Sequence, residues 1–562
     1  MKKVIALVLS AMMALSLAAC GGSSAETTTT ATTASGDETT TTASEGEETT
    51  AEETETEAEY EINYDSELIV GVSADIGSMN QFGASSSGVA IKKLLCYETL
   101  FYRDTEGELQ PLLAKSYEDK GNGTYEVELF DYITDSQGNA FTASDVEFSI
   151  EQLFGQSTQS DLWGTITDYK ATGDYTFEFT VDPEGTGQVE NILSRVSMIT
   201  KAAFDASPDE LATEPVGTGG YVLDTANSIS GASYTFVRRD DYWQTDEEYI
   251  TERNANYLKK LICKVYTDTS TLATGLETGE IDFTSDLDTN GLINFTDGVE
   301  PYSGYVQMKG ENNAFVHLMF NCADTVQGVT NPCADQNFRE AVCYAIDAAG
   351  CAYTVYGDLG IVCDAPTNPN LLDSGEEFAY DEYFGYDVDK AKELLEKSSY
   401  NGETIKILVL PRTTVSGSAV LIQNYLQAIG VTSELLEYDM SVFRTKRVES
   451  DPEYNIELLG ATTGDSYVYT SLKELNAETY ENGLSRIMIE DDELQAAFEA
   501  VASQETNSAE AVQELFDIVT DNCYIYGMYY SDKVLIGKDN IVTDACTVVP
   551  FFGPLFNSFV VE

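Results

Sequence analysis

The fold of this chain is decided by residues 403–437, which read ETIKILVLPRTTVSGSAVLIQNYLQAIGVTSELLE. The apolar run Ile405–Leu410 predicts a buried strand. Residues 419–429 predict a helix, and Gly430 is a typical residue after a helix because glycine adopts a left-handed conformation at little cost. A second strand is expected from Val431. A strand, a helix and a strand in this order predict a β-α-β unit, and therefore an α/β lobe with parallel strands.

Strands and helices alternate on both sides of this unit without a regular repeat. Residues 68–72 predict a buried strand, and residues 90–95 begin a helix. Three further helix starts carry polar capping residues. They are Thr142–Asp145, a capping box that opens a helix to Leu153; Asp335, before an apolar face of Phe338, Ala341, Val342, Ala345 and Ile346; and Asp387, before a helix that ends near Lys397.

Length and charge limit the classes of protein that fit. With 562 residues, the chain exceeds one ordinary core, so two or three lobes are expected. The formal charge of −66 argues against a nucleic-acid partner, whose phosphates need basic patches, and against docking on anionic lipid. The same charge favours solubility and suits cationic solutes.

The N-terminus has the pattern of an exported protein. Lys2 and Lys3 precede an apolar stretch from Val4 to Leu17, which is too short to span a bilayer. The sequence Leu17-Ala18-Ala19-Cys20 resembles the lipobox of bacterial lipoproteins. The resemblance implies that residues 1–19 are a signal peptide and that Cys20 carries the lipid. The alternative is a plain secretory signal in which Cys20 has no role.

The segment that follows Cys20 has the composition of a linker. Residues 21–64 contain 12 acidic and no basic residues, and Thr, Glu, Ala, Ser and Gly make up almost all of them. Such a segment cannot form a core. Residues 20–64 are therefore expected to be a lipid anchor and a disordered tether, with a span of roughly 35–40 Å for a flexible coil.

Other chemistry-bearing residues give few indications of a reaction. Nine cysteines besides Cys20 lack any C-x-x-C spacing, so most are expected to be small buried apolar residues, with one disulfide left open. The single histidine, His317, lies in a strand-like run and is expected to be structural. Asp286–Gly291 reads D-x-D-x-N-G, which suits either a calcium loop or an acidic turn. We expect no enzyme activity, no metal and no cofactor.

Four groups of motifs, in order, resemble the oligopeptide- and dipeptide-binding proteins of ABC importers, solute-binding family 5. They are Tyr97–Leu100 with Leu109–Tyr117; Phe141–Ser149; Pro215–Tyr221 with Arg239–Trp243; and Asn321 with Phe338–Val342 and Tyr344–Asp347. One departure is Gly220, which stands where the family usually has proline.

This resemblance implies an α/β fold of two periplasmic-binding-protein-like lobes joined by two hinge strands, with an extra α+β domain. By the order of the motifs, the hinge crossings are expected near residues 312 and 530. The expected parts are lobe 1 at 65–103, 212–312 and 531–562, the extra domain at 104–211, and lobe 2 at 313–530.

The resemblance also implies a binding site between the lobes. In the family, an aspartate of the second lobe binds the α-ammonium group of a peptide, and Asp465 matches its place. Thr462, Thr463 and Tyr467 are the expected neighbours, and Ser85, Ser86 and Ser87 are expected to pair with the peptide from the first lobe. Leu458 and Leu459 stand where some relatives have an arginine for the peptide carboxylate. Arg412, Arg444 and Arg447 are the possible substitutes.

The function implied is the capture of short peptides by lobe closure and their delivery to the membrane subunits of an ABC permease. The protein is expected to be a monomer, held by its lipid on the outer face of the cytoplasmic membrane, on the periplasmic side if the cell has two membranes. Two alternatives remain open: the same fold binding a sugar or a cationic small molecule, and a surface adhesin or scaffold without a transport role.

Overall fold

The computed structural model describes residues 61–562, apart from short internal gaps, and everything below refers to these residues. The gaps are residues 83–88, 155–165, 182–188, 311–313, 372, 376–377, 381–382, 448, 450, 462–466, 477–484, 504–507 and 550–552. The signal peptide, Cys20 and nearly all of the linker lie outside the described residues. Within them, no helix combines the length and the apolar character that crossing a bilayer requires.

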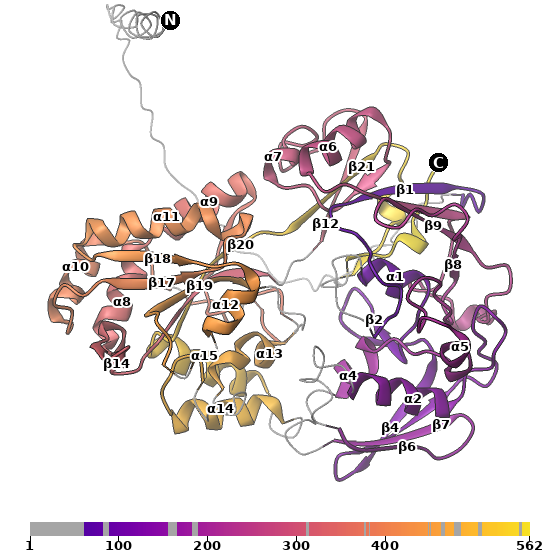
Figure 1. The fold of residues 1–562 in the computed structure, drawn as a ribbon, viewed down its shortest axis with the longest axis horizontal. Helices are drawn as coiled ribbons and strands as arrows, with labels where there is room; N and C mark the ends of the chain where they lie inside the picture. The colour runs from indigo at the N-terminus through magenta and orange to yellow at the C-terminus, as the bar shows by residue number, and fades with distance from the viewer. Residues whose placement is uncertain are drawn as a thin grey trace, which may run out of the picture. The chain divides into compact units, whose positions relative to one another are not determined.

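The first lobe is built on a mixed sheet to which three separate parts of the chain contribute (Figure 1). Strand β1 lies at its middle and pairs in parallel with β10 and β11, whereas the outer strands pair antiparallel. In spatial order the described strands are β12 (Tyr305–Gly310), β21 (Lys533–Lys538), β11 (Phe283–Thr284), β1 (Glu67–Val72), β10 (Lys260–Val265), β9 (Ser233–Arg238) and β8 (Tyr221–Leu223). The described α-helices of this lobe are α1 (Val89–Leu95), α6 (Thr269–Thr278) and α7 (Thr289–Leu292).

The second lobe has a sheet of its own, formed by strands between residues 315 and 530. Their spatial order is β16 (Ile361–Val362), β20 (Ile525–Tyr530), β13 (Phe315–Phe320), β19 (Ile456–Ala461), β17 (Ile405–Val409) and β18 (Ser433–Glu437). Helices cover both faces of this sheet, which makes the lobe a layered α/β structure (Figure 1). They are α8 (Gln336–Ala345), α9 (Ala348–Tyr356), α10 (Val388–Lys397), α11 (Thr413–Ala428), α12 (Met440–Arg447), α13 (Val468–Leu472), α14 (Asp492–Ala502) and α15 (Ala509–Asp521).

The β-α-β unit predicted from residues 403–437 is present as β17, α11 and β18. Strands β17 and β18 pair in parallel, and Gly430 follows the helix with a φ of 94°. Helix α11 begins at Thr413, six residues earlier than predicted. Residues 413–418 have poor helix propensity, but the Tyr529 hydroxyl donates to the Thr414 carbonyl at 3.0 Å and contacts the Ser418 hydroxyl at 2.7 Å. These tertiary contacts stabilise the first turns of the helix.

A smaller antiparallel sheet lies within residues 104–211, the segment expected to form the extra domain. Its order is β4 (Ala114–Gly121), β5 (Thr124–Leu129), β7 (Thr176–Val181) and β6 (Ile166–Ala171). Helices α2 (Ala143–Phe154), α4 (Val189–Arg195) and α5 (Lys201–Ala206) complete this segment, and a hairpin of β2 (Phe101–Arg103) and β3 (Leu109–Pro111) precedes it. One of the two bonds of the predicted capping box of α2 is present, because the Asp145 carboxylate accepts the Thr142 amide at 2.8 Å.

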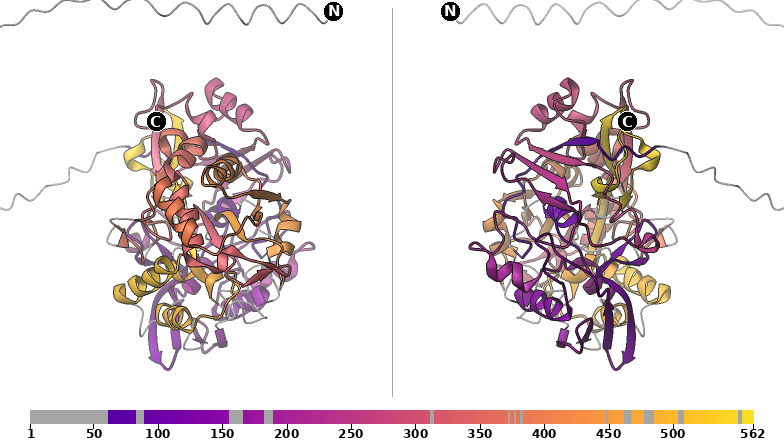
Figure 2. Two further views of the ribbon diagram at one scale, coloured as in Figure 1. Left: turned by 90° about the vertical axis from the view of Figure 1, so that its left-hand side faces the viewer. Right: turned by 90° about the vertical axis from the view of Figure 1, so that its right-hand side faces the viewer.

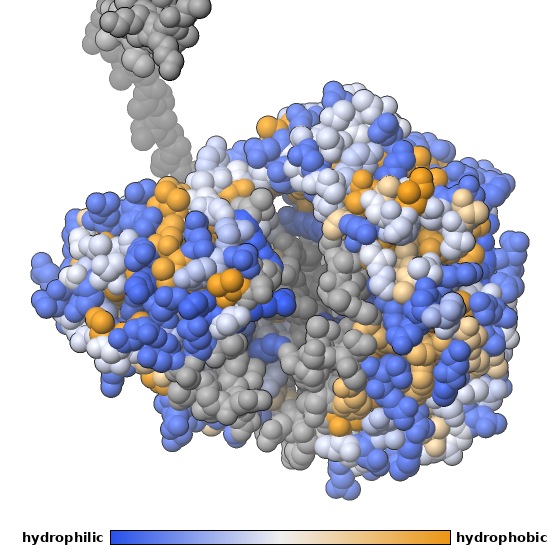
Figure 3. Space-filling model, in the orientation of Figure 1, coloured by the Kyte–Doolittle hydropathy of each residue, from blue (hydrophilic) through white to orange (hydrophobic). Residues whose placement is uncertain are grey.

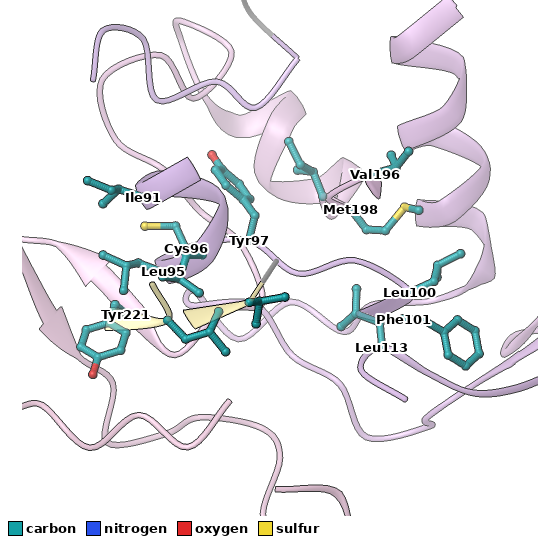
Figure 4. Close-up of a cluster of buried hydrophobic side chains, with 14 of the residues drawn as sticks. Ile91, Leu95, Cys96, Tyr97, Leu100, Phe101, Leu113, Val196, Met198 and Tyr221 are labelled. Carbon is teal, nitrogen blue, oxygen red and sulfur yellow. The ribbon is translucent and has the colours of Figure 1, made fainter. Parts of the chain in front are cut away.

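One hydrophobic core joins this segment to the first lobe. Figure 4 shows buried side chains of both parts in one cluster, among them Leu95 and Tyr221 of the first lobe and Leu113 and Met198 of residues 104–211. The second lobe has a separate core, which includes Phe320, Phe338 and Leu458. The chain therefore folds around two main cores rather than three.

The chain crosses between the two large sheets twice. Strand β12 of the first sheet leads to β13 of the second, and β20 of the second leads to β21 of the first through Ser531 and Asp532. The two crossing strands are neighbours in each sheet, since β12 pairs with β21 and β13 with β20. The chain then ends in the first lobe, where Phe559 contacts Phe283 at a ring distance of 5.2 Å (Figures 1 and 2).

The motifs Tyr97–Leu100 and Arg239–Trp243 contact each other in the first lobe, and these contacts account for the residue types in both. The buried Glu98 carboxylate accepts hydrogen bonds from Tyr242 at 2.5 Å and from the Trp243 indole at 3.0 Å. The glycine-rich loop packs against the end of α1. A Cβ atom on Gly217 would lie 2.2 Å from the Cys96 carbonyl oxygen, and one on Gly220 would lie 2.2 Å from the Asn256 side chain. A larger residue at position 220 therefore has no room in this chain.

Candidate functional site

Most of the predicted ligand contacts fall outside the described residues. Ser85, Ser86 and Ser87 belong to the gap at 83–88, and Thr462, Thr463 and Asp465 belong to the gap at 462–466. Tyr467 is the one predicted contact that the structure describes, at the N-terminal end of α13. The site therefore has to be located from the neighbouring strands and side chains.

The segment 462–466 begins at the carboxyl edge of the second sheet. Strands β17 and β19 are neighbours and run in parallel, with Val409 opposite Leu458. Their carboxyl ends lead to Arg412 and to residue 462, so both segments leave the sheet at the same edge. In open α/β sheets, ligands bind at this edge. The exposed guanidinium of Arg412 has no hydrogen-bond or ion-pair partner among the described residues, so it is available to an anionic group.

Tyr467 joins the second lobe to the first. Tyr467 is the residue before α13, and the Arg103 guanidinium, at the end of β2, lies 5.4 Å from the centre of its ring and donates to its hydroxyl. Arg103 also forms an ion pair with Glu190 of α4 at 2.9 Å. Burial raises the pKa of Tyr467, so its hydroxyl stays protonated at neutral pH. Arg103 and Tyr467 therefore form a contact between the two lobes.

A buried carboxylate, Asp373, lies beside Tyr467. One oxygen of Asp373 accepts the Val468 amide at 2.6 Å, and the other is buried without a hydrogen-bond partner among the described residues. Burial raises the pKa of the Asp373 carboxyl to about 6. A carboxylate held in this way favours a cation, because a charge removed from water is costly unless it is paired.

Asp373 was not among the predicted site residues. Asp373 is one of 96 acidic residues in the chain, and no local motif distinguishes it. Arg103 and Glu190 were also missed, because their contacts with the second lobe join residues that are far apart in the chain.

His317 is buried, as expected for a structural residue, but it is not satisfied. The side chain is 3% exposed, and neither ring nitrogen has a hydrogen-bond partner among the described residues. Its ring contacts Phe315 in a tilted arrangement, with 4.9 Å between the ring centres, and burial lowers the pKa of the imidazole to about 4, so His317 is neutral at pH 7.

An ion cluster lies next to His317 on the same face of the second sheet. Arg447 of α12 binds the Glu457 carboxylate of β19 at 2.7 Å and also pairs with Glu474. Burial raises the pKa of Glu457. Burial also acts on Glu474, but the Arg447 charge outweighs it and holds the pKa of Glu474 below its usual value. Arg447 is thus committed to two carboxylates, so it is not a free substitute for the missing carboxylate-binding arginine.

The acidic turn at Asp286–Gly291 uses its carboxylates for local structure. Asp286 accepts the Ser73 amide at 2.8 Å and the Ser73 hydroxyl at 2.9 Å. Asp288 caps α7 by accepting the Gly291 amide at 2.9 Å. In the part of the chain that the structure describes, no group of three or more His, Cys, Asp or Glu residues is arranged to hold a metal ion. The geometry favours the acidic turn over the calcium loop.

These features define a two-lobed α/β protein whose lobes meet at Arg103 and Tyr467. Comparison with known families identifies the type: residues 108–482 match the model of the bacterial extracellular solute-binding proteins, family 5 (middle region), and the chain belongs to this family. Its relatives are solute-binding proteins rather than enzymes.

Individual relatives are distant. The chain is 24% identical over 391 residues to the glutathione-binding protein GsiB of Escherichia coli O1:K1 / APEC, which covers 66% of this chain and 70% of that protein. It is 25% identical over 390 residues to a probable peptide ABC transporter periplasmic-binding protein, y4tO, of Sinorhizobium fredii, with 66% and 70% covered. The crystal structure of a putative peptide binding protein, AppA, of Clostridium difficile superposes with a TM-score of 0.74 at 18% identity, covering 88% of this chain and all of that one.

Proposed function

We propose that this protein captures short peptides outside the cytoplasmic membrane and delivers them to the membrane subunits of an ABC permease. The observation that carries the proposal is the shared edge of β17 and β19. Arg412 follows one of these neighbouring parallel strands, and the segment with Asp465 follows the other. A peptide is a zwitterion, so Arg412 at this sheet edge suits its carboxylate, and we assign Asp465, which follows β19 in the sequence, to its ammonium group.

The contact between Arg103 and Tyr467 supports a mechanism of lobe closure. The lobes meet at this point, where Arg103 of the first lobe contacts Tyr467 of the second. Within the described residues, the chain itself crosses between the two sheets only from β12 to β13 and from β20 to β21. A ligand held by both lobes shifts the protein toward the closed arrangement, and the permease then recognises that arrangement. Binding and release require no chemical change in the ligand, so we propose no enzyme activity.

The relatives support a peptide as the ligand. Glutathione is a tripeptide, and one relative is described as glutathione-binding and another as a probable peptide transporter component. Glutathione and unmodified tripeptides are therefore the first probes. A sugar or a cationic small molecule in the same site remains the alternative, and the same experiment separates these classes.

The test is a thermal-melting screen of the full chain with a peptide pool, glutathione, sugars and polyamines. A peptide present at about 100 times its Kd stabilises the folded state by about 2.7 kcal/mol, which raises Tm by several degrees. N-acetylated peptides should give a much smaller shift, as should the variant Asp465→Asn with unmodified peptides. Asp364→Asn, at an exposed position, is the matched control. A shift with sugars or polyamines but with no peptide would contradict the proposal.

The membrane anchor is the second part of the proposal. We infer that the chain is cut before Cys20 and that lipid on Cys20 holds it at the membrane, with residues 21–64 as a tether. The spacing from the lipobox-like sequence supports this. An anchor and a tether keep a binding protein within a small volume and so raise its effective concentration at the permease. The protein acts as a monomer in this scheme, because one copy supplies both lobes.

A further inference from the structure

Two buried cysteines of the second lobe lie in direct contact. The Sγ atoms of Cys343 and Cys523 are 3.2 Å apart, although the residues are 180 positions apart in the chain. Both side chains are fully buried. Cys322 and Cys333 are buried in the same core.

The two cysteines are held together by elements that are themselves fixed. Cys343 lies on α8, and Cys523 lies in the turn between α15 and β20. Arg339, one turn earlier on α8, donates to the Asn522 carbonyl from Nε at 3.0 Å and from Nη2 at 2.6 Å. This clamp holds the turn against the helix, next to the thiol pair. Cys523 has a φ of 51°, a left-handed conformation that is unusual for a residue with a Cβ atom.

The geometry suits a covalent bond between the sulfurs. A disulfide has a sulfur–sulfur distance of about 2.05 Å, so the two atoms have to approach by about 1.2 Å. A cysteine that serves only as a small apolar residue has no need for a second sulfur at this distance.

We propose that Cys343 and Cys523 form a disulfide when the protein folds outside the cytoplasm. Each thiol loses a proton and together they lose two electrons. The oxidant is a low-molecular-weight or enzyme-bound disulfide, which is reduced to two thiols through a mixed disulfide on one of the cysteines. Since both thiols are buried in the folded lobe, and burial raises the pKa of Cys343, the reaction takes place before the core closes.

The bond would stabilise the base of the second lobe. It joins α8 to the turn that leads into β20, and the other end of β20 continues to the crossing at Ser531 and Asp532. The pair lies in the second core, away from Tyr467 and the sheet edge of the site. The disulfide should therefore change stability and leave ligand affinity unchanged. The inference rests on the proposed extracytoplasmic location only for the source of the oxidant.

The experiment starts from the full chain, unfolded and reduced, and refolds it in oxidised and reduced glutathione. Free thiols are then blocked with iodoacetamide, and peptides are mapped by mass spectrometry without reduction. We expect one cross-linked pair of peptides that contains Cys343 and Cys523. Recovery of both residues in alkylated form, or a cross-link of either one to Cys322 or Cys333, would overturn the proposal. This result does not depend on ligand binding.

Thermal melting gives the second measurement. Dithiothreitol added before refolding should lower the Tm of the wild type by about 3–8 °C, because a cross-link across a long loop restricts the unfolded chain. Cys343→Ala and Cys523→Ala should each abolish this difference. Cys351→Ala, a buried cysteine of the same lobe, should retain it. If the alanine variants do not fold, the peptide map of the wild type still decides.

Discussion

The guanidinium of Arg103 and the ring of Tyr467 lie 5.4 Å apart, although 364 positions separate them in the chain. Arg103 belongs to the first lobe and Tyr467 to the second, so this pair is part of the contact that holds the lobes together. The ring provides a cation–π contact, and the hydroxyl accepts a hydrogen bond from the guanidinium. The two contributions can be separated by mutation.

Tyr467→Phe removes the hydroxyl and leaves the ring. A hydrogen bond to a charged donor contributes about 1.5 kcal/mol, so we expect the ligand found in the melting screen to dissociate about tenfold faster. Stopped-flow or surface plasmon resonance measurements give this rate. Tyr353→Phe, at an exposed position, is the control and should match the wild type. Equal rates for all three proteins would show that the contact does not stabilise the closed form.

Asp373 should make the free energy of unfolding depend on pH, and a neutral replacement should remove this dependence. Its pKa is about 6 in the folded protein and about 3.8 when unfolded. Between these values the folded state binds more protons, so this group's contribution to stability falls by about 2 kcal/mol as pH rises from 4 to 6. Asp373→Asn should lose this contribution. Urea unfolding at several pH values measures it, with Asp364→Asn as control, and parallel curves for wild type and Asp373→Asn would contradict it.

His317 should change stability with pH in the direction opposite to that of Asp373. Its pKa is about 4 when folded and about 6.5 when unfolded. The unfolded state therefore binds more protons between pH 4 and 6.5, and stability rises with pH over this range by about 3 kcal/mol. His317→Gln keeps a hydrogen-bonding side chain but removes the titratable imidazole. The free energy of unfolding of the variant, measured from pH 4 to 7, should rise less steeply than that of the wild type. An unchanged slope would mean that the imidazole is not buried in its neutral form.

The lipid anchor is tested at Cys20. When the complete chain is expressed in a bacterium that processes lipoproteins, the wild type should partition into the detergent phase of a Triton X-114 separation. Cys20→Ser should move to the aqueous phase, because at least two acyl chains are needed for stable anchoring. Cys546→Ser, which leaves the lipobox-like sequence intact, should behave as the wild type. A wild-type protein in the aqueous phase would point to a plain secretory signal.

The local pattern of the sequence predicted the elements but not the contacts between them. The caps at Asp335 and Asp387 and the glycine at position 430 act on neighbouring residues, so short stretches of sequence were sufficient to predict them. The predicted start of α11 was wrong, because Tyr529 stabilises a turn that Thr413 and its neighbours would not form alone.

The site was harder to predict than the fold. Tyr467 was found by its place in a family motif, whereas Asp373 lies 95 positions away from Val468 and meets it only in the folded chain. Its unusual property, a buried carboxylate oxygen without a partner, arises from the surroundings and not from the residues beside it in the sequence. The contacts between residues that are distant in the chain decide this part of the site.

The ion cluster around Arg447 should be a main source of stability in the second lobe. Arg447→Met removes one cation and leaves Glu457 and Glu474 without their partner, and Glu457 is 1% exposed. Breaking a buried ion pair by the loss of one partner costs about 3–5 kcal/mol. Arg444→Met, on the same helix but exposed, should change stability by less than about 0.5 kcal/mol. Urea unfolding followed by tryptophan fluorescence and circular dichroism compares the two, and an equal effect at both positions would show that the cluster contributes nothing beyond a surface charge.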